Sequence, residues 1–359
     1  MAELTYLSTN RKAIRDQIAD HPMLAFLILA FVISWIGWTL SDKIDLGLAN
    51  GFGVIGSAGP ALAAMIVSAL FRPEPSDVPA GKRWRLFGII GISAMAVMVV
   101  RRLWVTPEWL VVADTVHTAV AYPNFWAFPV DVLAAVVIAF LLSGIYSPRQ
   151  GVRDLLYSLN PRRQSVRWYW WVIAMGLYPL VLLLGNTISA RLGLTVPAPI
   201  ATRSWSVVAL DLLLAFLYLL IGGGGLEEPG WRGFVLPSLQ KRYSPLRSSL
   251  ILAVFWTLWH LPFFGWLGGG VQGGVLGVVF AMIVYFLTDI APSASLFTAV
   301  FNRTGGSLPI VILLHASINT TYNMLQPVSS LVLIIWLLLG LGIMLWMWRS
   351  PRTFSPRCE

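Results

Sequence analysis

Cysteine is almost absent from this chain of 359 residues, which contains one, Cys358. A single thiol cannot form an intrachain disulfide or a cysteine-based metal site. It is also the second residue from the end, whereas a C-a-a-X prenylation signal needs cysteine in the fourth position from the end. We therefore expect Cys358 to be an incidental terminal thiol.

Charge is also scarce, because 11% of the residues are charged and 57% are hydrophobic. A water-soluble globule of this size cannot bury so much apolar surface. The 17 Trp and 10 Tyr fit a protein in a bilayer, where amphipathic rings settle at the headgroup level. The composition predicts an all-α fold, a polytopic membrane helix bundle with the lipid bilayer as its partner.

The formal net charge of +9 does not indicate a nucleic-acid partner. No basic cluster is interleaved with aromatic residues on a soluble segment, as nucleic-acid binding would require. A basic balance in a membrane protein mostly records the Lys and Arg of its cytoplasmic loops. We expect no nucleic acid to bind.

Apolar runs of about 20 residues, the length that crosses a bilayer, recur along the whole chain. They cover 23–42, 51–71, 86–104, 125–145, 168–187, 205–222, 247–265, 272–290, 307–325 and 328–348. The run 86–104 is the weakest, because Arg101 and Arg102 interrupt its end. The sequence thus predicts about ten transmembrane helices, with roughly eight as the lower bound.

The loop charges predict the orientation of these helices. If the N-terminus is cytoplasmic, alternate segments hold 20 of the 25 Lys and Arg residues, and the opposite segments hold the other five. This alternation follows the positive-inside rule. We expect a multi-pass protein of the cell membrane with both termini in the cytoplasm, and we interpret 23–42 as a retained span rather than a cleaved signal.

A polar, basic segment at 146–167 divides the apolar runs into two groups. Asp154, Leu155 and Leu156 have helical spacing there, which predicts a surface helix on the inner leaflet. We place a soft boundary at this segment. Residues 1–150 then form an N-terminal membrane block of accessory spans, and residues 151–359 form the block that carries the chemistry.

Ionisable residues at membrane depth are costly, so each is a functional hypothesis. The segment IGGGGLEEPGWRGF holds Glu227 and Glu228, with Arg232 four residues after Glu228. On a helix Glu228 and Arg232 share a face and can pair, which leaves Glu227 available as a general base. The alternative is a cytoplasmic loop with both glutamates solvated, but four consecutive glycines favour a chain that folds back toward the membrane.

Two histidines lie within apolar runs, whereas His21 and His117 lie outside them. His260 follows Trp256 by one turn, and His315 precedes Asn319 by one turn. The His315 and Asn319 side chains can donate hydrogen bonds to a developing oxyanion. Each polar pair alone is also explained by hydrogen bonds between neighbouring membrane helices, but three such features within about 95 residues indicate one site.

These three motifs, Glu-Glu-x-x-x-Arg, aromatic-x-x-x-His and His-x-x-x-Asn, resemble in order and spacing those of the CAAX protease and bacteriocin-processing family of intramembrane endopeptidases. The flanking strings WHLPFF and NRTGGSLP are similar too, and VRWYWW at 166–171 is a weaker match. The resemblance covers about 205–325. Trp256 stands where the family motif often has Phe, and residues 72–145 look longer than a bare family core.

The resemblance implies an endopeptidase that cleaves a membrane-associated protein or peptide, prenylated or not. Glu227 and His260 would activate water, His315 and Asn319 would hold the oxyanion, Glu228 and Arg232 would be structural, and Trp256 would wall the cavity. We favour metal-free chemistry, although Glu227, His260 and His315 also suit a three-ligand zinc site. For this site to form, residues 222–240 must dip toward the two histidines.

Two other functions remain open at this point. A non-catalytic scaffold or a self-immunity protein against a bacteriocin would use the same fold, although the intact motifs favour catalysis. A transporter would show two repeated halves with broken helices, and the sequence has no such repeat. The physiological substrate does not follow from any residue.

Overall fold

The computed structural model describes residues 20–46, 50–75, 78–104, 125–160, 166–194, 205–325 and 329–350. Within these ranges all regular structure is helical, and one isolated bridge joins Pro75 to Arg149. The predicted all-α fold is confirmed. His117 and Cys358 lie outside the described residues.

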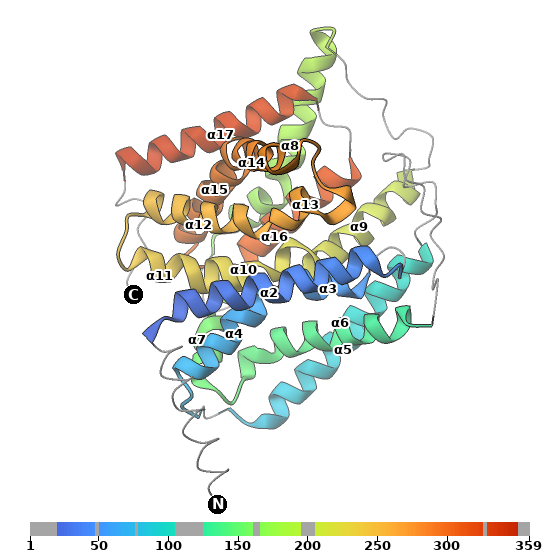
Figure 1. The fold of residues 1–359 in the computed structure, drawn as a ribbon, viewed down its shortest axis with the longest axis vertical. Helices are drawn as coiled ribbons and strands as arrows, with labels where there is room; N and C mark the ends of the chain where they lie inside the picture. Colours follow the sequence, from blue (N-terminus) through green and yellow to red (C-terminus); the bar gives the residue numbers. More distant parts are fainter. Residues whose placement is uncertain are drawn as a thin grey trace, which may run out of the picture.

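The helices of the N-terminal half are α2 (Pro22–Lys43), α3 (Gly51–Ser57), α4 (Gly59–Phe71), α5 (Ala80–Trp104), α6 (Ala127–Leu142), η2 (Ser143–Tyr146), α7 (Gln150–Leu156) and η3 (Tyr157–Leu159). They are followed by α8 (Tyr169–Arg191), α9 (Trp205–Gly222), η5 (Gly224–Leu226), α10 (Glu228–Gly230), η6 (Trp231–Val235), α11 (Leu236–Gln240), α12 (Pro245–Trp259) and α13 (Leu261–Gly265). The last are η7 (Leu267–Gly269), α14 (Gly274–Tyr285), η8 (Phe286–Ile290), α15 (Ala291–Arg303), α16 (Leu308–Met324) and α17 (Ser330–Arg349) (Figure 1).

The described residues contain seven helical segments long and apolar enough to cross a membrane, or eight if α3 and α4, bent by 51°, form one span. Gly81–Arg102 is one of the seven, so the doubtful run at 86–104 has the length of a full span. Eight is the lower bound of the prediction, and the count of ten is not confirmed.

Two predicted spans are shorter in the structure, and a turn interrupts the first of them. The run 247–265 is divided at His260, so α12 has 15 residues, and the run 307–325 gives the 17 residues of α16. Two others are longer than predicted. Val208–Gln240 and Gly274–Arg303 form helical segments of 33 and 30 residues. The first runs on from α9 through η5, α10, η6 and α11, and the second runs from α14 through η8 into α15, where the sequence predicted a loop.

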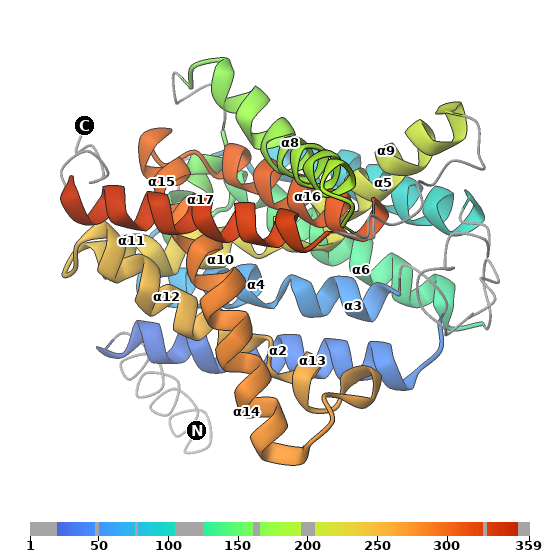
Figure 2. The ribbon, with the colours of Figure 1, turned by 90° about the horizontal axis from the view of Figure 1, so that it is seen from above.

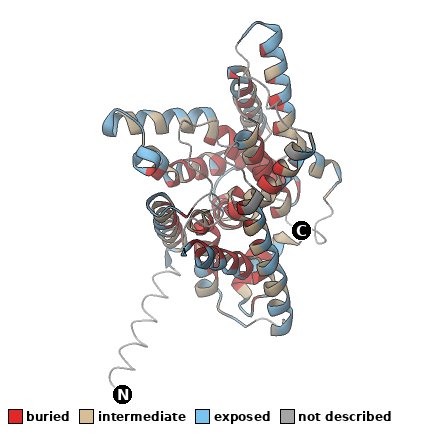
Figure 3. Ribbon diagram, turned by 90° about the vertical axis from the view of Figure 1, so that its right-hand side faces the viewer, coloured by how far each residue is buried: buried red, intermediate tan, exposed pale blue. Residues whose placement is uncertain are grey.

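Many large apolar residues are exposed on the outside of the bundle, in addition to those buried in its core, and Figure 3 shows where exposed and buried residues lie along the ribbon. Helix α14 has no buried residue, and Leu276 on it is 83% exposed. It lies at the edge of the bundle (Figure 2). Such exposed apolar area is expected where lipid replaces water as the solvent.

The interior is centred on α15, which is buried from Ala291 to Asn302. It packs against α12, α16 and α17, while α16 also packs against α8 and α9. The N-terminal α2 is tied to this interior, because Trp35 Nε1 donates a hydrogen bond to the carbonyl oxygen of Trp259 at 2.9 Å. The predicted boundary near residue 150 is not tested by these contacts.

The predicted surface helix is present but shorter, as α7 and η3. Its apolar residues Val152, Leu155 and Leu156 are buried in the protein. Gly151 allows this, since a Cβ there would lie 2.1 Å from the carbonyl oxygen of Ser68 on α4. The apolar face of α7 therefore packs against helices, whereas the sequence predicted that it lay on the leaflet.

Candidate active site

The site begins where α9 breaks at four consecutive glycines. α9 ends at Gly222, and every residue from Gly224 to Arg232 is buried. A Cβ at Gly225 would lie 2.2 Å from the carbonyl oxygen of Leu220, and one at Gly224 would lie 2.3 Å from Nε2 of His315. Only glycine permits this close approach of the backbone to α9 and to the imidazole.

The first glutamate, Glu227, is buried directly after this break, with 6% of its surface exposed. Its Oε2 atom accepts a hydrogen bond from Nε1 of Trp256 at 3.0 Å. The chain at 222–240 thus keeps Glu227 inside the protein instead of in a solvated loop. Electrostatic interactions of a carboxylate in such a place are strong, because little water screens them.

The second glutamate, Glu228, is fully buried and contacts both a guanidinium group and an imidazole ring. Its Oε1 atom accepts a hydrogen bond from Nη1 of Arg232 at 2.9 Å and lies 2.6 Å from Nδ1 of His315. Arg232 lies on the π-helical turn η6, a type of distortion often found at functional sites. One carboxylate oxygen therefore links η6 to α16.

Arg232 is held by aromatic rings as well as by Glu228. Its guanidinium carbon lies 4.4 Å from the ring centroid of Trp256 and 4.5 Å from that of Phe297. Such cation–π contacts help to offset the cost of burying the charge. Phe297 on α15 is a site residue that the motifs did not predict, since a phenylalanine in an apolar run carries no distinguishing signal.

His260 lies at the turn between α12 and α13. Its Nδ1 atom is 2.8 Å from the carbonyl oxygen of Trp256. Because a carbonyl oxygen only accepts, Nδ1 must carry the proton, and Nε2 of the neutral ring is left as an acceptor. The Tyr285 ring packs edge-on at 5.5 Å between centroids, and it is a second neighbour that the sequence did not predict.

His315 is also oriented by its Nδ1 atom. The carboxylate of Glu228 accepts a hydrogen bond from that nitrogen, and the opposite side of the ring, with Nε2, lies against Gly224. Trp256 lies against both histidines, with centroid separations of 5.5 Å to His315 and 5.9 Å to His260. The indole of Trp256 therefore connects Glu227 and the two imidazoles in one site.

Asn319 lies one turn after His315 on α16 and is half-buried. Its backbone carbonyl oxygen accepts from Nδ2 of Asn323 at 2.7 Å. Within the described part of the chain, the structure gives its side-chain amide no hydrogen-bond partner. The amide is thus available for a bound molecule.

The zinc alternative requires three ligands around one point. Among the described residues, no group of three or more His, Cys, Asp or Glu side chains is arranged to hold a metal ion. The Nδ1 atoms of His260 and His315 are hydrogen-bonded to the carbonyl oxygen of Trp256 and to Glu228, which leaves Nε2 of each ring as the possible ligand atom. Because the three side chains are not arranged around one point in this geometry, we derive no step through a metal.

Comparisons with known proteins identify the same part of the chain. Residues 209–321 match the family model described as type II CAAX prenyl endopeptidase Rce1-like. Over 109 residues the chain is 30% identical to CAAX prenyl protease 2 of Methanococcus maripaludis. This match covers 30% of the chain and 40% of the length of that relative. All seven residues of the three motifs lie within the matched segment.

Proposed function

We propose that this chain is an intramembrane endopeptidase of the CAAX protease and bacteriocin-processing family, on the basis of the match over residues 209–321. It would hydrolyse a peptide bond in a membrane-associated protein or peptide. The observation that supports this most is the burial of Glu227 beside Trp256, next to two histidines that both present Nε2.

The proposed nucleophile is a water molecule between Glu227 and His260. Glu227 takes one proton from the water while Nε2 of His260 accepts a hydrogen bond from the other, and the hydroxide attacks the peptide carbonyl. Glu227 then returns its proton to the departing amine, so that a carboxylic acid and an amine are formed. The buried position strengthens each of these electrostatic contacts.

The oxyanion formed in this attack would be held by Asn319 and His315. Asn319 needs no change of protonation, because its amide always carries donor hydrogens. His315 donates its Nδ1 proton to Glu228. It can therefore donate a hydrogen bond to the oxyanion from Nε2 only when that nitrogen is protonated as well. Removing one such donor typically costs 10²- to 10³-fold in kcat.

The test is a cleavage assay with the full-length protein in detergent. Two peptides of one sequence, with and without a farnesyl group on a C-a-a-X cysteine, distinguish a prenylated substrate from an unmodified one. Glu227→Gln should lose about 10²- to 10⁴-fold in rate but retain its melting temperature, since the amide oxygen still accepts from Trp256. The exposed Glu74→Gln variant is the matched control.

Retention of full activity by Glu227→Gln would overturn the proposed mechanism. Failure of the wild-type protein to cleave either peptide or any longer membrane-protein substrate would favour the non-catalytic scaffold or immunity function. In that case the buried cluster of Glu228, Arg232 and His315 would serve stability alone.

A further inference from the structure

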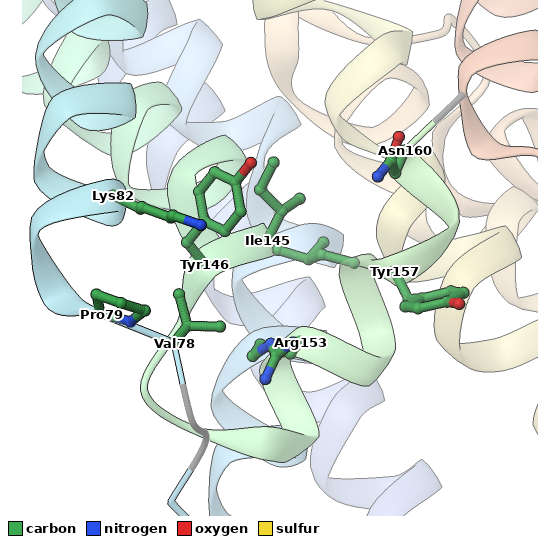
Figure 4. A pocket seen from close by; sticks show the side chains of 9 residues that line it. Val78, Pro79, Lys82, Ile145, Tyr146, Arg153, Tyr157 and Asn160 are labelled. Carbon is green, nitrogen blue, oxygen red and sulfur yellow. The ribbon is translucent and has the colours of Figure 1, made fainter. Parts of the chain in front are cut away.

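A separate pocket lies outside the segment that matches the family. It has a volume of about 270 Å³ and is lined by Val78, Pro79, Lys82, Ile145, Tyr146, Arg153, Leu156, Tyr157 and Asn160. Figure 4 shows that these side chains come from the segment leading into α5, from the start of α5, and from residues 145–160, which include parts of η2, α7 and η3. None of these residues belongs to the candidate active site.

The pocket is cationic. Among its described lining residues Lys82 and Arg153 are basic and none is acidic. The neighbouring carboxylate of Asp154 is used elsewhere, since it pairs with Nη1 of Arg72 at 2.6 Å and accepts from Nε2 of Gln150. Within the described part of the chain, the structure gives neither pocket cation an ion-pair partner. The site therefore presents two uncompensated positive charges.

The position of the pocket along the helices sets its depth. Lys82 is the second residue of the candidate span Gly81–Arg102, and Tyr146 is the last residue of Ala127–Tyr146. One candidate span thus begins at the pocket and another ends there, which places the pocket at the level of the lipid headgroups. Tyrosines are typical of this level, and Trp84, 65% exposed, lies half a turn deeper.

The remaining lining residues fit the body of a phospholipid. Val78, Pro79, Ile145 and Leu156 supply apolar contacts, while Tyr146, Tyr157 and Asn160 carry polar groups. The loop charges predict that this end of the bundle faces the cytoplasm, where anionic lipids are concentrated. Basic pockets between helices on that side are suited to phosphate headgroups.

We infer that this pocket binds the phosphate of an anionic phospholipid, with Lys82 and Arg153 as the charged contacts. The chemistry recognised is a phosphate ester with net negative charge, which a soluble phosphate shares. The lipid differs because its glycerol and acyl chains also contact the apolar wall. This inference does not depend on the proposed proteolytic activity.

Native mass spectrometry of the full-length protein in detergent can measure the binding. Dioleoylphosphatidylglycerol is compared with dioleoylphosphatidylcholine, and glycerol 3-phosphate is the soluble competitor. We expect the wild type to retain the anionic lipid. Lys82→Gln and Arg153→Gln should each weaken retention about fivefold, and the double variant about 25-fold, from roughly 1 kcal/mol per basic residue near a membrane surface.

Arg85→Gln is the matched control, because Arg85 is exposed on the same helix and does not line the pocket. It should bind the lipid as the wild type does, and Lys82→Arg should retain binding as well. Displacement by glycerol 3-phosphate at equal concentration would assign the site to soluble phosphates. Equal retention of both lipids by the wild type, or wild-type retention by the double variant, would overturn the inference.

Discussion

The Nδ1 atom of His315 lies 2.6 Å from the same carboxylate oxygen of Glu228 that accepts from Arg232. The sequence assigned Glu228 to Arg232 alone, as the i and i+4 pair of one helix. The structure adds a contact between residues 87 positions apart. Glu228 therefore has two tasks, to balance a buried cation and to orient an imidazole.

The first prediction concerns this shared carboxylate. Glu228→Gln leaves an oxygen that can accept a hydrogen bond, but it removes the negative charge beside the fully buried Arg232. Loss of one partner of a buried pair costs about 3–5 kcal/mol. We expect a clear drop in the melting temperature in detergent, which circular dichroism at 222 nm would follow.

Glu227→Gln is the control for this measurement, because it leaves the pair of Glu228 and Arg232 intact. It should lose activity and retain its melting temperature, whereas Glu228→Gln should lose both. Equal melting temperatures for the two variants would contradict the structural role of Glu228.

The second prediction concerns Gly224. A Cβ there would lie 2.3 Å from both Cδ2 and Nε2 of His315, so Gly224→Ala must displace the imidazole or the backbone. A misplacement of about 1 Å in an active site can cost about 100-fold in rate. We expect a loss of this order in the cleavage assay with either peptide.

Gly176→Ala on α8 is the matched substitution, since no atom lies within 4 Å of the position that its Cβ would take. It should retain activity, and the better helix propensity of alanine should leave stability equal or slightly raised. Full activity of Gly224→Ala would mean that His315 does not need its present position.

The sequence predicted the class of fold and the motif residues, because both depend on local patterns. Apolar runs identified most of the spans, and the spacing of three or four residues placed Glu228 with Arg232 and His315 with Asn319 on common helix faces. Helix lengths were harder to predict. His260 ends α12 within an apolar run, whereas the π-helical turn at 231–235 and helix α15 at 291–303 lie where the sequence predicted residues between spans.

Contacts between distant segments could not be predicted from local patterns. Three such contacts depend on how the helices cross: the hydrogen bond from Trp256 to Glu227, the contact of the Phe297 ring with Arg232, and the contact of the Tyr285 ring with His260. No periodicity in one segment encodes such a crossing. The four glycines did indicate that the chain folds back toward the membrane, but only the fold shows that Gly224 lies against His315.

The third prediction distinguishes the two uses of Trp256. Trp256→Phe retains an aromatic ring beside Arg232 but removes the N–H that Glu227 accepts. A hydrogen bond to a charged group contributes about 1.5–3 kcal/mol, so the unfolding midpoint in detergent should fall. The same change at Trp259 is a close control, because its buried Nε1 has no hydrogen-bond partner among the described residues.

If Trp256→Phe and Trp259→Phe lower the midpoint equally, the loss is one of ring volume and not of the hydrogen bond. If the unfolding midpoint falls further for Trp256→Phe than for Trp259→Phe, the indole N–H of Trp256 is the group that stabilises buried Glu227.

The fourth prediction concerns metal ions. In the proposed mechanism, Glu227 and His260 activate water without a metal, and Asn319 supplies an oxyanion donor. Cleavage should therefore be unchanged after incubation with 1,10-phenanthroline followed by desalting. Inhibition that added zinc reverses would contradict the glutamate mechanism and would assign Glu227, His260 and His315 as ligands.

The fifth prediction separates α5 and α6 from the segment that carries the proposed chemistry. Arg102 on α5 forms a bidentate pair with Asp131 on α6, both fully buried, and also bonds to the carbonyl oxygen of Leu46. Asp131→Asn should destabilise the protein by about 3–5 kcal/mol, because it removes the carboxylate charge from a buried, bidentate ion pair. The double variant Arg102→Leu with Asp131→Leu should recover most of that stability, since an apolar pair of similar volume suits a buried position between helices.

Neither residue contacts Glu227 or the two histidines, so the rate of cleavage per folded molecule should remain that of the wild type in both variants. A selective loss of activity without a change in melting temperature would show instead that α5 and α6 take part in the reaction or in binding the substrate.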